Sequence, residues 1–90
     1  MLEELMTYIA AFFSHFGATR FRRLCQEKRV SVELMPVPRA ISSSCGTCAR
    51  FTDFPLGDGK TWPQEVEFVV KVSEDPIKGA YTEIYRAPGA

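Results

Sequence analysis

The spacing of apolar residues changes along the chain, and these changes indicate where strands and helices lie. Residues 6–13 form a nearly continuous apolar run rich in aromatic side chains, which is typical of a strand covered on at least one face. Ser14 is well suited to cap a helix. Apolar residues then recur at helical spacing, and we expect this helix to end near Lys28 or Arg29. Its apolar positions are Ala18, Phe21, Leu24 and Cys25.

The middle of the chain predicts two further strands joined by a loop. Residues 30–37 alternate between apolar and polar, and Pro36 and Pro38 remove backbone donors where this strand should end. Residues 39–46 are mostly small, as in a loop, and residues 47–54 return to strand-like composition. Residues 79–86 predict a last strand in the same way.

Residues 62–73 fit two different elements, and they follow a turn predicted at residues 56–60. The stretch Trp-Pro-Gln-Glu resembles a helix start, with a proline and an acid in the first turn. The valines at 66, 69 and 70 would then share one helix face. However, apolar residues also alternate from 66 to 72, and β-branched residues favour strands. The sequence favours a helix because its N-terminal signals are specific, and a strand is the alternative.

Together these elements follow the order β-α-β-β-α-β, which is the ferredoxin-like split βαβ pattern. We therefore predict a single α+β domain over residues 1–90, with an antiparallel four-stranded sheet and two helices on one face. In this order the end of the first strand and the loop at residues 39–46 emerge at the same end of the sheet. Ser14 and His15 should therefore lie on the same rim as that loop.

Composition and charge narrow the function classes. The chain is 46% hydrophobic and has 11 basic and 11 acidic residues, which fits a globular protein and argues against a nucleic-acid binder. The apolar N-terminal run follows Glu3 and Glu4 and is about half as long as a membrane span, so it predicts neither a signal peptide nor a membrane segment. We expect a cytoplasmic protein, and the small size of the domain is compatible with a homodimer. One basic cluster is interpreted as a solvated helix face: Arg20, Arg22, Arg23, Lys28 and Arg29.

Three cysteines are present, and two of them, Cys45 and Cys48, form a Cys-x-x-Cys motif. An odd number with this spacing argues against a secreted disulfide framework, and in the cytosol the motif suggests redox, sulfur or metal chemistry. Cys25 lies on the apolar helix face and is expected to be buried. Cys48 sits where a strand begins, so a place in the core and a role in resolving a bond to Cys45 are both open.

Cys45 is the principal candidate because a useful thiol must be reachable and ionisable. The neighbouring serine hydroxyls can stabilise a sulfur anion, and glycine after the cysteine permits backbone amides to point at the sulfur. An arginine adds positive charge, and a histidine on the same rim could exchange a proton. The predicted site comprises the thiols Cys45 and Cys48, supported by Arg39, Ser43, Ser44, Gly46 and His15.

The stretch Met-Pro-Val-Pro-Arg-Ala-Ile-Ser-Ser-Ser-Cys-Gly at residues 35–46 resembles the signature of a small bacterial family of selenium/sulfur carrier-like proteins (DUF3343). The resemblance extends from the first strand to about Phe51. It implies that the cysteine at position 45 holds sulfur or selenium, received from a donor protein and passed to an acceptor protein. This chain departs from the family pattern at Cys48, where an apolar residue is more usual, and after Asp53.

These observations favour a carrier without catalytic activity of its own and without a cofactor. The alternative is a dithiol redox or metal-binding module that uses both cysteines of the motif. A structural zinc site needs four ligands, and the chain offers Cys45, Cys48 and His15, so a dimer would have to complete it. Ferredoxin-like copper carriers place their cysteines after the first strand, where this chain has none.

Overall fold

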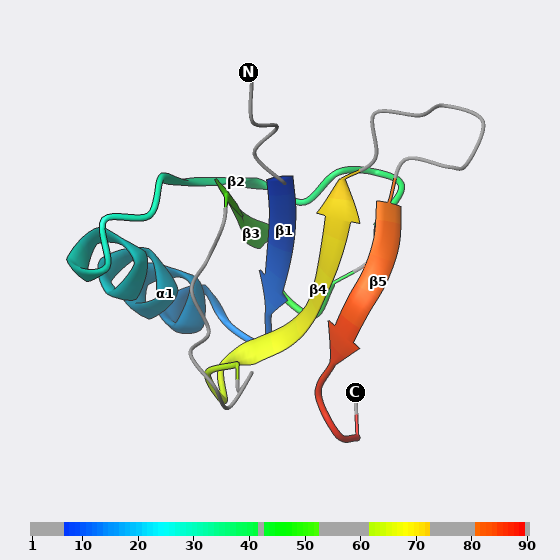
Figure 1. Cartoon of the computed structure of the whole chain (residues 1–90). Coiled ribbons are helices and arrows are strands. Elements are labelled where there is room, and N and C mark those ends of the chain that lie inside the picture. Colours follow the sequence, from blue (N-terminus) through cyan, green and yellow to red (C-terminus); the bar gives the residue numbers. More distant parts are fainter. Residues whose placement is uncertain (1–6, 42, 53–61, 73–80, 90) are drawn as a thin grey trace, which may run out of the picture.

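The computed structural model describes residues 7–41, 43–52, 62–72 and 81–89, and Figure 1 shows their arrangement. These residues form one helix and five strands, and they do not include the turn predicted at 56–60. The elements are β1 (Thr7–Phe12), α1 (His15–Glu27), β2 (Val32–Pro36), β3 (Thr47–Thr52), β4 (Val66–Val72) and β5 (Tyr81–Arg86).

The strands form one antiparallel sheet in the order β2-β3-β1-β4-β5. The apolar first strand is central, which explains why its residues are buried on both faces. Helix α1 connects β1 to β2, and β3 lies between these two strands. The α+β class is therefore confirmed, but the described residues do not form four strands and two helices.

The second helix predicted over residues 62–73 is wrong, because residues 66–72 form β4. The proline-containing segment before it makes a turn, in which the amide of Val66 donates to the carbonyl of Pro63 at 3.0 Å. The signal that suited a helix N-terminus also suits this turn, since proline is favoured in both.

A bulge in β4 explains why its apolar residues imitate helical spacing. Ala11 of β1 pairs with Phe68, whereas the next residue, Phe12, pairs with Val66. Glu67 is thus an extra residue in the ladder between β1 and β4. The extra residue places Val66 and Val69 in the same core cluster, three positions apart, although both belong to a strand.

Helix α1 begins and ends where the sequence predicted. The hydroxyl of Ser14 accepts from the amide of Gly17 at 3.3 Å and caps the first turn. At the other end Arg29 has a φ of 61°, and the amide of Val30 donates to the carbonyl of Cys25 at 2.8 Å, as in a Schellman motif. Among the described residues, no helix combines the length and apolar character needed to cross a membrane.

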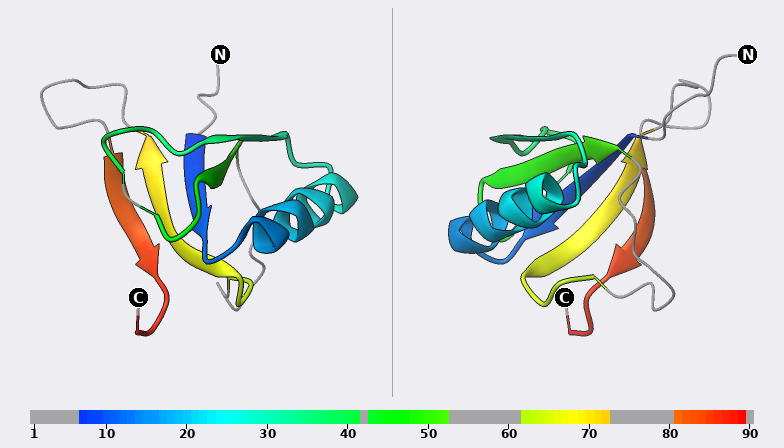
Figure 2. Two further views of the ribbon diagram at one scale, coloured as in Figure 1. Left: turned by 180° about the vertical axis from the view of Figure 1, so that it is seen from behind. Right: turned by 60° about the vertical axis from the view of Figure 1, so that its left-hand side comes forward.

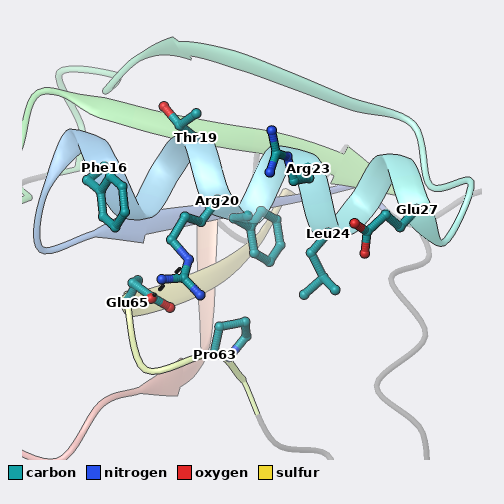
Figure 3. Close-up of a pocket in the computed structure, with 9 residues that line it drawn as sticks. Phe16, Thr19, Arg20, Arg23, Leu24, Glu27, Pro63 and Glu65 are labelled. Atoms are coloured by element: carbon teal, nitrogen blue, oxygen red, sulfur yellow. Dashed lines mark ion pairs between the residues drawn. The ribbon is translucent and has the colours of Figure 1, made fainter.

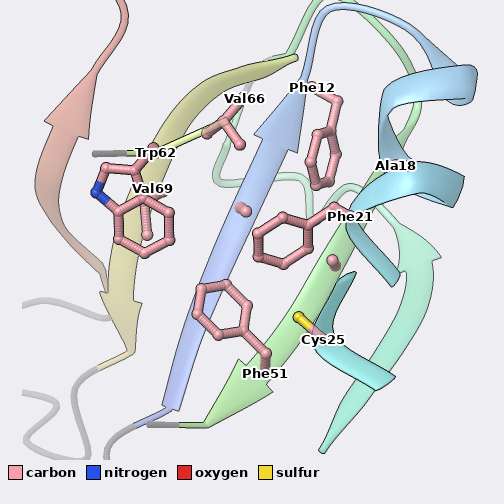
Figure 4. Packing of buried hydrophobic residues seen from close by; sticks show 10 residues of the cluster. Phe12, Ala18, Phe21, Cys25, Phe51, Trp62, Val66 and Val69 are labelled. Carbon is pink, nitrogen blue, oxygen red and sulfur yellow. The ribbon is translucent and has the colours of Figure 1, made fainter. Parts of the chain in front are cut away.

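Two apolar clusters cover the two faces of the sheet. The first is formed with α1 and contains an aromatic group in which Phe21 and Phe51 have ring centroids 5.1 Å apart (Figure 4). The second lies on the opposite face and includes Ile9, Phe68 and Val70, with Ile41 packed against it. Figure 2 shows the segment after β2 crossing this opposite face. The chain must therefore return to the helix side of the sheet between residue 41 and β3.

Substitution of Gly17 by alanine is expected to destabilise the domain. A Cβ atom at this position would lie 2.6 Å from Cβ of Glu65, so the helix or the turn before β4 would have to move. We expect a loss of about 1–3 kcal/mol in the free energy of unfolding, measured by urea denaturation. Gly46→Ala is the matched control, because a Cβ there has nothing within 4 Å, and its stability should not fall. Equal stability of Gly17→Ala and the wild type would contradict the close approach.

Candidate functional site

Cys45 lies at the rim of the sheet, two residues before β3 begins at Thr47. Its side chain is half-buried and packs against the cluster on the helix side. The thiol donates to the carbonyl of Thr47, with Sγ 3.3 Å from the oxygen. The described arrangement therefore directs the Cys45 thiol at the backbone at the start of β3.

Glu67 binds the loop that carries Cys45, and sequence reasoning did not identify it. Its Oε1 accepts from the amide of Ser44 at 2.9 Å, and its Oε2 accepts from the Ser44 hydroxyl at 3.0 Å. The Ser43 hydroxyl lies within donating distance of both Glu67 Oε1, at 3.3 Å, and the carbonyl of Phe12, at 3.4 Å. These serines were predicted to stabilise a sulfur anion, but their hydroxyls donate to Glu67 and to the backbone instead.

The bulge in β4 explains how a glutamate in an apolar strand reaches the loop. As the extra residue between Val66 and Phe68, Glu67 interrupts the regular alternation of side chains at the end of the sheet. Its carbonyl accepts from the amide of Ala87 at 2.9 Å, which fixes its backbone against the end of β5. A single acid among the valines of residues 66–72 was the available signal in the sequence, but its partner depends on the bulge.

Ser43 connects this carboxylate contact to the cysteine. The amide of Cys45 donates to the Ser43 hydroxyl oxygen at 3.3 Å. A continuous set of hydrogen bonds therefore runs from Glu67 through Ser43 to the backbone of Cys45. The Glu67 carboxylate is therefore linked through Ser43 to the backbone that carries the thiol.

His15 lies on the same rim, as the element order predicted. Its Nδ1 is 3.2 Å from Oγ1 of Thr47, the residue whose carbonyl accepts the Cys45 thiol. The imidazole is exposed to solvent. Helix α1 thus contacts the start of β3 at the site.

Two of the predicted supporting residues differ from expectation. Arg39 is exposed in a turn closed by the bond from the Ile41 amide to the Pro38 carbonyl, and no ion pair or hydrogen bond joins it to the other described site residues. Gly46 does not have a positive φ, and a Cβ there would meet no atom within 4 Å. The geometry therefore does not require glycine at position 46.

Cys48 lies on the opposite face of the sheet from Cys45. It is 1% exposed and belongs to the cluster opposite α1, whereas Cys45 packs against the cluster beneath the helix. Burial raises the pKa of Cys48 to about 11, and the neighbouring charge of Cys45 adds to this effect. Its thiol lies 3.7 Å from the carbonyl of Pro36. The motif is therefore not a symmetrical pair of exposed thiols.

Cys25 is buried in α1, as the sequence predicted, and is fully inaccessible. Desolvation raises its pKa to about 12. Cys25 and Cys48 thus remain protonated at neutral pH, and among the three thiols only Cys45 is partly exposed.

The buried thiols predict that stability falls in alkaline solution. A thiol with a raised pKa in the folded state contributes stability below its ordinary value of 9.0, and this contribution is lost as the pH rises toward about 11 for Cys48 and about 12 for Cys25. Urea denaturation at pH 8 and at pH 10.5 should show this decrease. The double variant Cys25→Ala/Cys48→Ala should lose less stability over the same interval. Equal decreases in both proteins would contradict the attribution of the stability loss to these two thiols.

A hollow between α1 and the turn before β4 contains none of the predicted site residues. It is lined by residues of α1 and of the turn before β4, and Arg20 Nε lies 3.6 Å from Glu65 Oε2 across it (Figure 3). The basic residues predicted to form a solvated helix face are exposed. Within the described parts of the chain, no three His, Cys, Asp or Glu residues are grouped as metal ligands.

Comparison with known proteins gave a match to one family model. Residues 7–57, more than half of the chain, match the model of a family described as "Putative Se/S carrier protein-like". The match includes Cys45 and His15 but ends before Glu67. Neither the curated proteins nor the solved structures gave a match. The chain belongs to the family of Se/S carrier protein-like proteins.

Proposed function

We propose that this protein is a cytoplasmic sulfur or selenium carrier whose acceptor atom is Sγ of Cys45. The observation that carries the proposal is the contrast among the three thiols. Cys45 is partly exposed on a loop at the sheet rim, whereas Cys25 and Cys48 are buried and have raised pKa values. Membership of the carrier-like family supports sulfur or selenium as the cargo.

Loading follows ordinary thiol exchange with a donor protein that carries a persulfide. Cys45 first loses its proton to water, and its thiolate attacks the outer sulfur of the donor persulfide. The S–S bond of the donor breaks, the donor cysteine leaves as a thiolate, and Cys45 becomes a persulfide. Delivery repeats this exchange with a thiolate on the acceptor protein, so no external oxidant or reductant is required. Selenium transfer would proceed by the same exchange.

A role for both cysteines as a dithiol pair receives less support. Cys48 packs on the opposite face of the sheet and its thiol remains protonated at neutral pH. A disulfide between Cys45 and Cys48 would require one side chain to leave its cluster.

The proposal is tested by incubating the purified chain with a cysteine desulfurase and cysteine, followed by intact-mass spectrometry. We expect the mass of one additional sulfur atom per chain, removed by a reducing agent. A chain that acquires no sulfur from a desulfurase known to be active on another acceptor would contradict the proposal. Stoichiometric zinc in the purified protein would instead favour a metal site.

A further inference from the structure

We propose that Glu67 is a positioning residue that holds the Cys45 loop closed and thereby sets how readily the thiol reacts. This inference deepens the proposed function, and its biological meaning rests on that function. The contact of Glu67 with the loop and its effect on the thiol can be tested without any sulfur transfer.

Several hydrogen bonds from the loop converge on one carboxylate. Glu67 accepts from the Ser44 amide, from the Ser44 hydroxyl and, within 3.3 Å, from the Ser43 hydroxyl. Bonds to a charged acceptor are stronger than those between neutral groups. Residues 43–46 contain no regular secondary structure. Besides the Glu67 contacts, they are attached by the bond from the Ser43 hydroxyl to the Phe12 carbonyl and the bond from the Val37 amide to the Gly46 carbonyl.

The hydrogen bonds that start at Glu67 extend to the cysteine itself. Ser43 accepts from the Cys45 amide, and the Cys45 thiol is directed at the carbonyl of Thr47. In this position the sulfur is half-buried and its thiol is engaged by the Thr47 carbonyl. A loop released from Glu67 would free the sulfur from that carbonyl and expose it to reagents and to a donor protein.

Glu67 is also held by contacts that do not involve the loop. The bulge sets its position in β4, and the bond from the Ala87 amide to its carbonyl holds it against the end of β5. The pKa of Arg86 is raised, mainly by its hydrogen bond to Glu83 and additionally by the charge of Glu67. The backbone of Glu67 is thus held by contacts that lie outside the loop.

The test measures the alkylation rate of each cysteine in the folded full-length chain. Wild type, Glu67→Ala and Glu67→Gln are treated with a limiting amount of iodoacetamide, and labelling of each cysteine is quantified by peptide mass spectrometry. We expect Cys45 in Glu67→Ala to react about tenfold faster, because the loss of charged hydrogen bonds favours loop opening. Glu67→Gln retains an acceptor oxygen and should restore a rate closer to that of the wild type.

The buried cysteines serve as an internal control, because Cys25 and Cys48 react only when the domain opens. Glu33→Ala is the matched control, since Glu33 is exposed on β2 and its substitution should leave the Cys45 rate unchanged. A Cys45 rate in Glu67→Ala equal to that of the wild type would overturn the inference. A rise shared equally by all three cysteines would overturn it too, because it would reflect unfolding. If sulfur loading fails while Cys45 alone becomes more reactive, the carrier proposal is contradicted and the role of Glu67 stands.

Discussion

Substitution of Cys45 by serine is expected to reduce sulfur loading by a desulfurase to the level seen without a donor. Serine keeps the size of the side chain and can donate to the Thr47 carbonyl as the thiol does, so the loop should retain its structure. Its hydroxyl cannot form a persulfide. Loading is measured as the mass gained by the intact chain after a fixed time of incubation with desulfurase and cysteine.

The matched control is Cys48→Ala, which removes the other cysteine of the motif. Because Cys48 is buried and its pKa is raised to about 11, this variant should load as much sulfur as the wild type. Normal loading of Cys45→Ser would contradict the proposal that Cys45 accepts the sulfur. Loss of loading in both variants, with both proteins folded, would instead favour the dithiol module.

Substitution of Phe51 by alanine is expected to destabilise the domain more than Gly17→Ala does. Phe51 is 1% exposed, and its ring centroid lies 5.6 Å from that of Tyr8, 5.1 Å from that of Phe21 and 5.9 Å from that of Trp62. Removal of a fully buried aromatic ring costs about 3–5 kcal/mol, through lost burial and the cavity that remains. Small domains have a total stability of about 5–15 kcal/mol, so a substantial unfolded population is expected at 37 °C.

Urea denaturation followed by circular dichroism measures this loss. Ile84→Ala provides a control on β5, because Ile84 is 48% exposed and its truncation should change stability by less than about 0.5 kcal/mol. Phe51→Leu keeps part of the apolar volume and should lie between the alanine variant and the wild type. A loss below about 1 kcal/mol in Phe51→Ala would show that the aromatic cluster does not organise the core as described.

Local sequence signals predicted the first half of the fold well. The apolar run of β1, the cap at Ser14 and the alternation in β2 each depend on neighbouring residues, and each was confirmed. The position of His15 beside the start of β3 also followed, because it depends only on element order. Residues 66–72 were misassigned because the proline and acid before them were interpreted as a helix start but form a turn, and the bulge at Glu67 left valines at helical spacing.

The site was predicted only in part, for a similar reason. The sequence identified the loop and its most accessible cysteine, but it assigned the serine hydroxyls to the sulfur. Their actual acceptor, Glu67, lies on a strand 23 positions away from Ser44, and the contact exists only because β4 pairs with β1 in this register. The separation of Cys45 and Cys48 onto opposite faces likewise depends on where β3 begins.

The proposal that Cys45 is the acceptor is tested most directly by locating the transferred sulfur in the wild-type chain. After loading by a desulfurase, persulfides are trapped by alkylation, the chain is digested, and the peptides are cleaved further so that Cys45 and Cys48 are distinguished by fragment masses. We expect the additional sulfur on Cys45, with Cys25 and Cys48 unmodified. Additional sulfur on Cys48 or Cys25, with Cys45 unmodified, would contradict it.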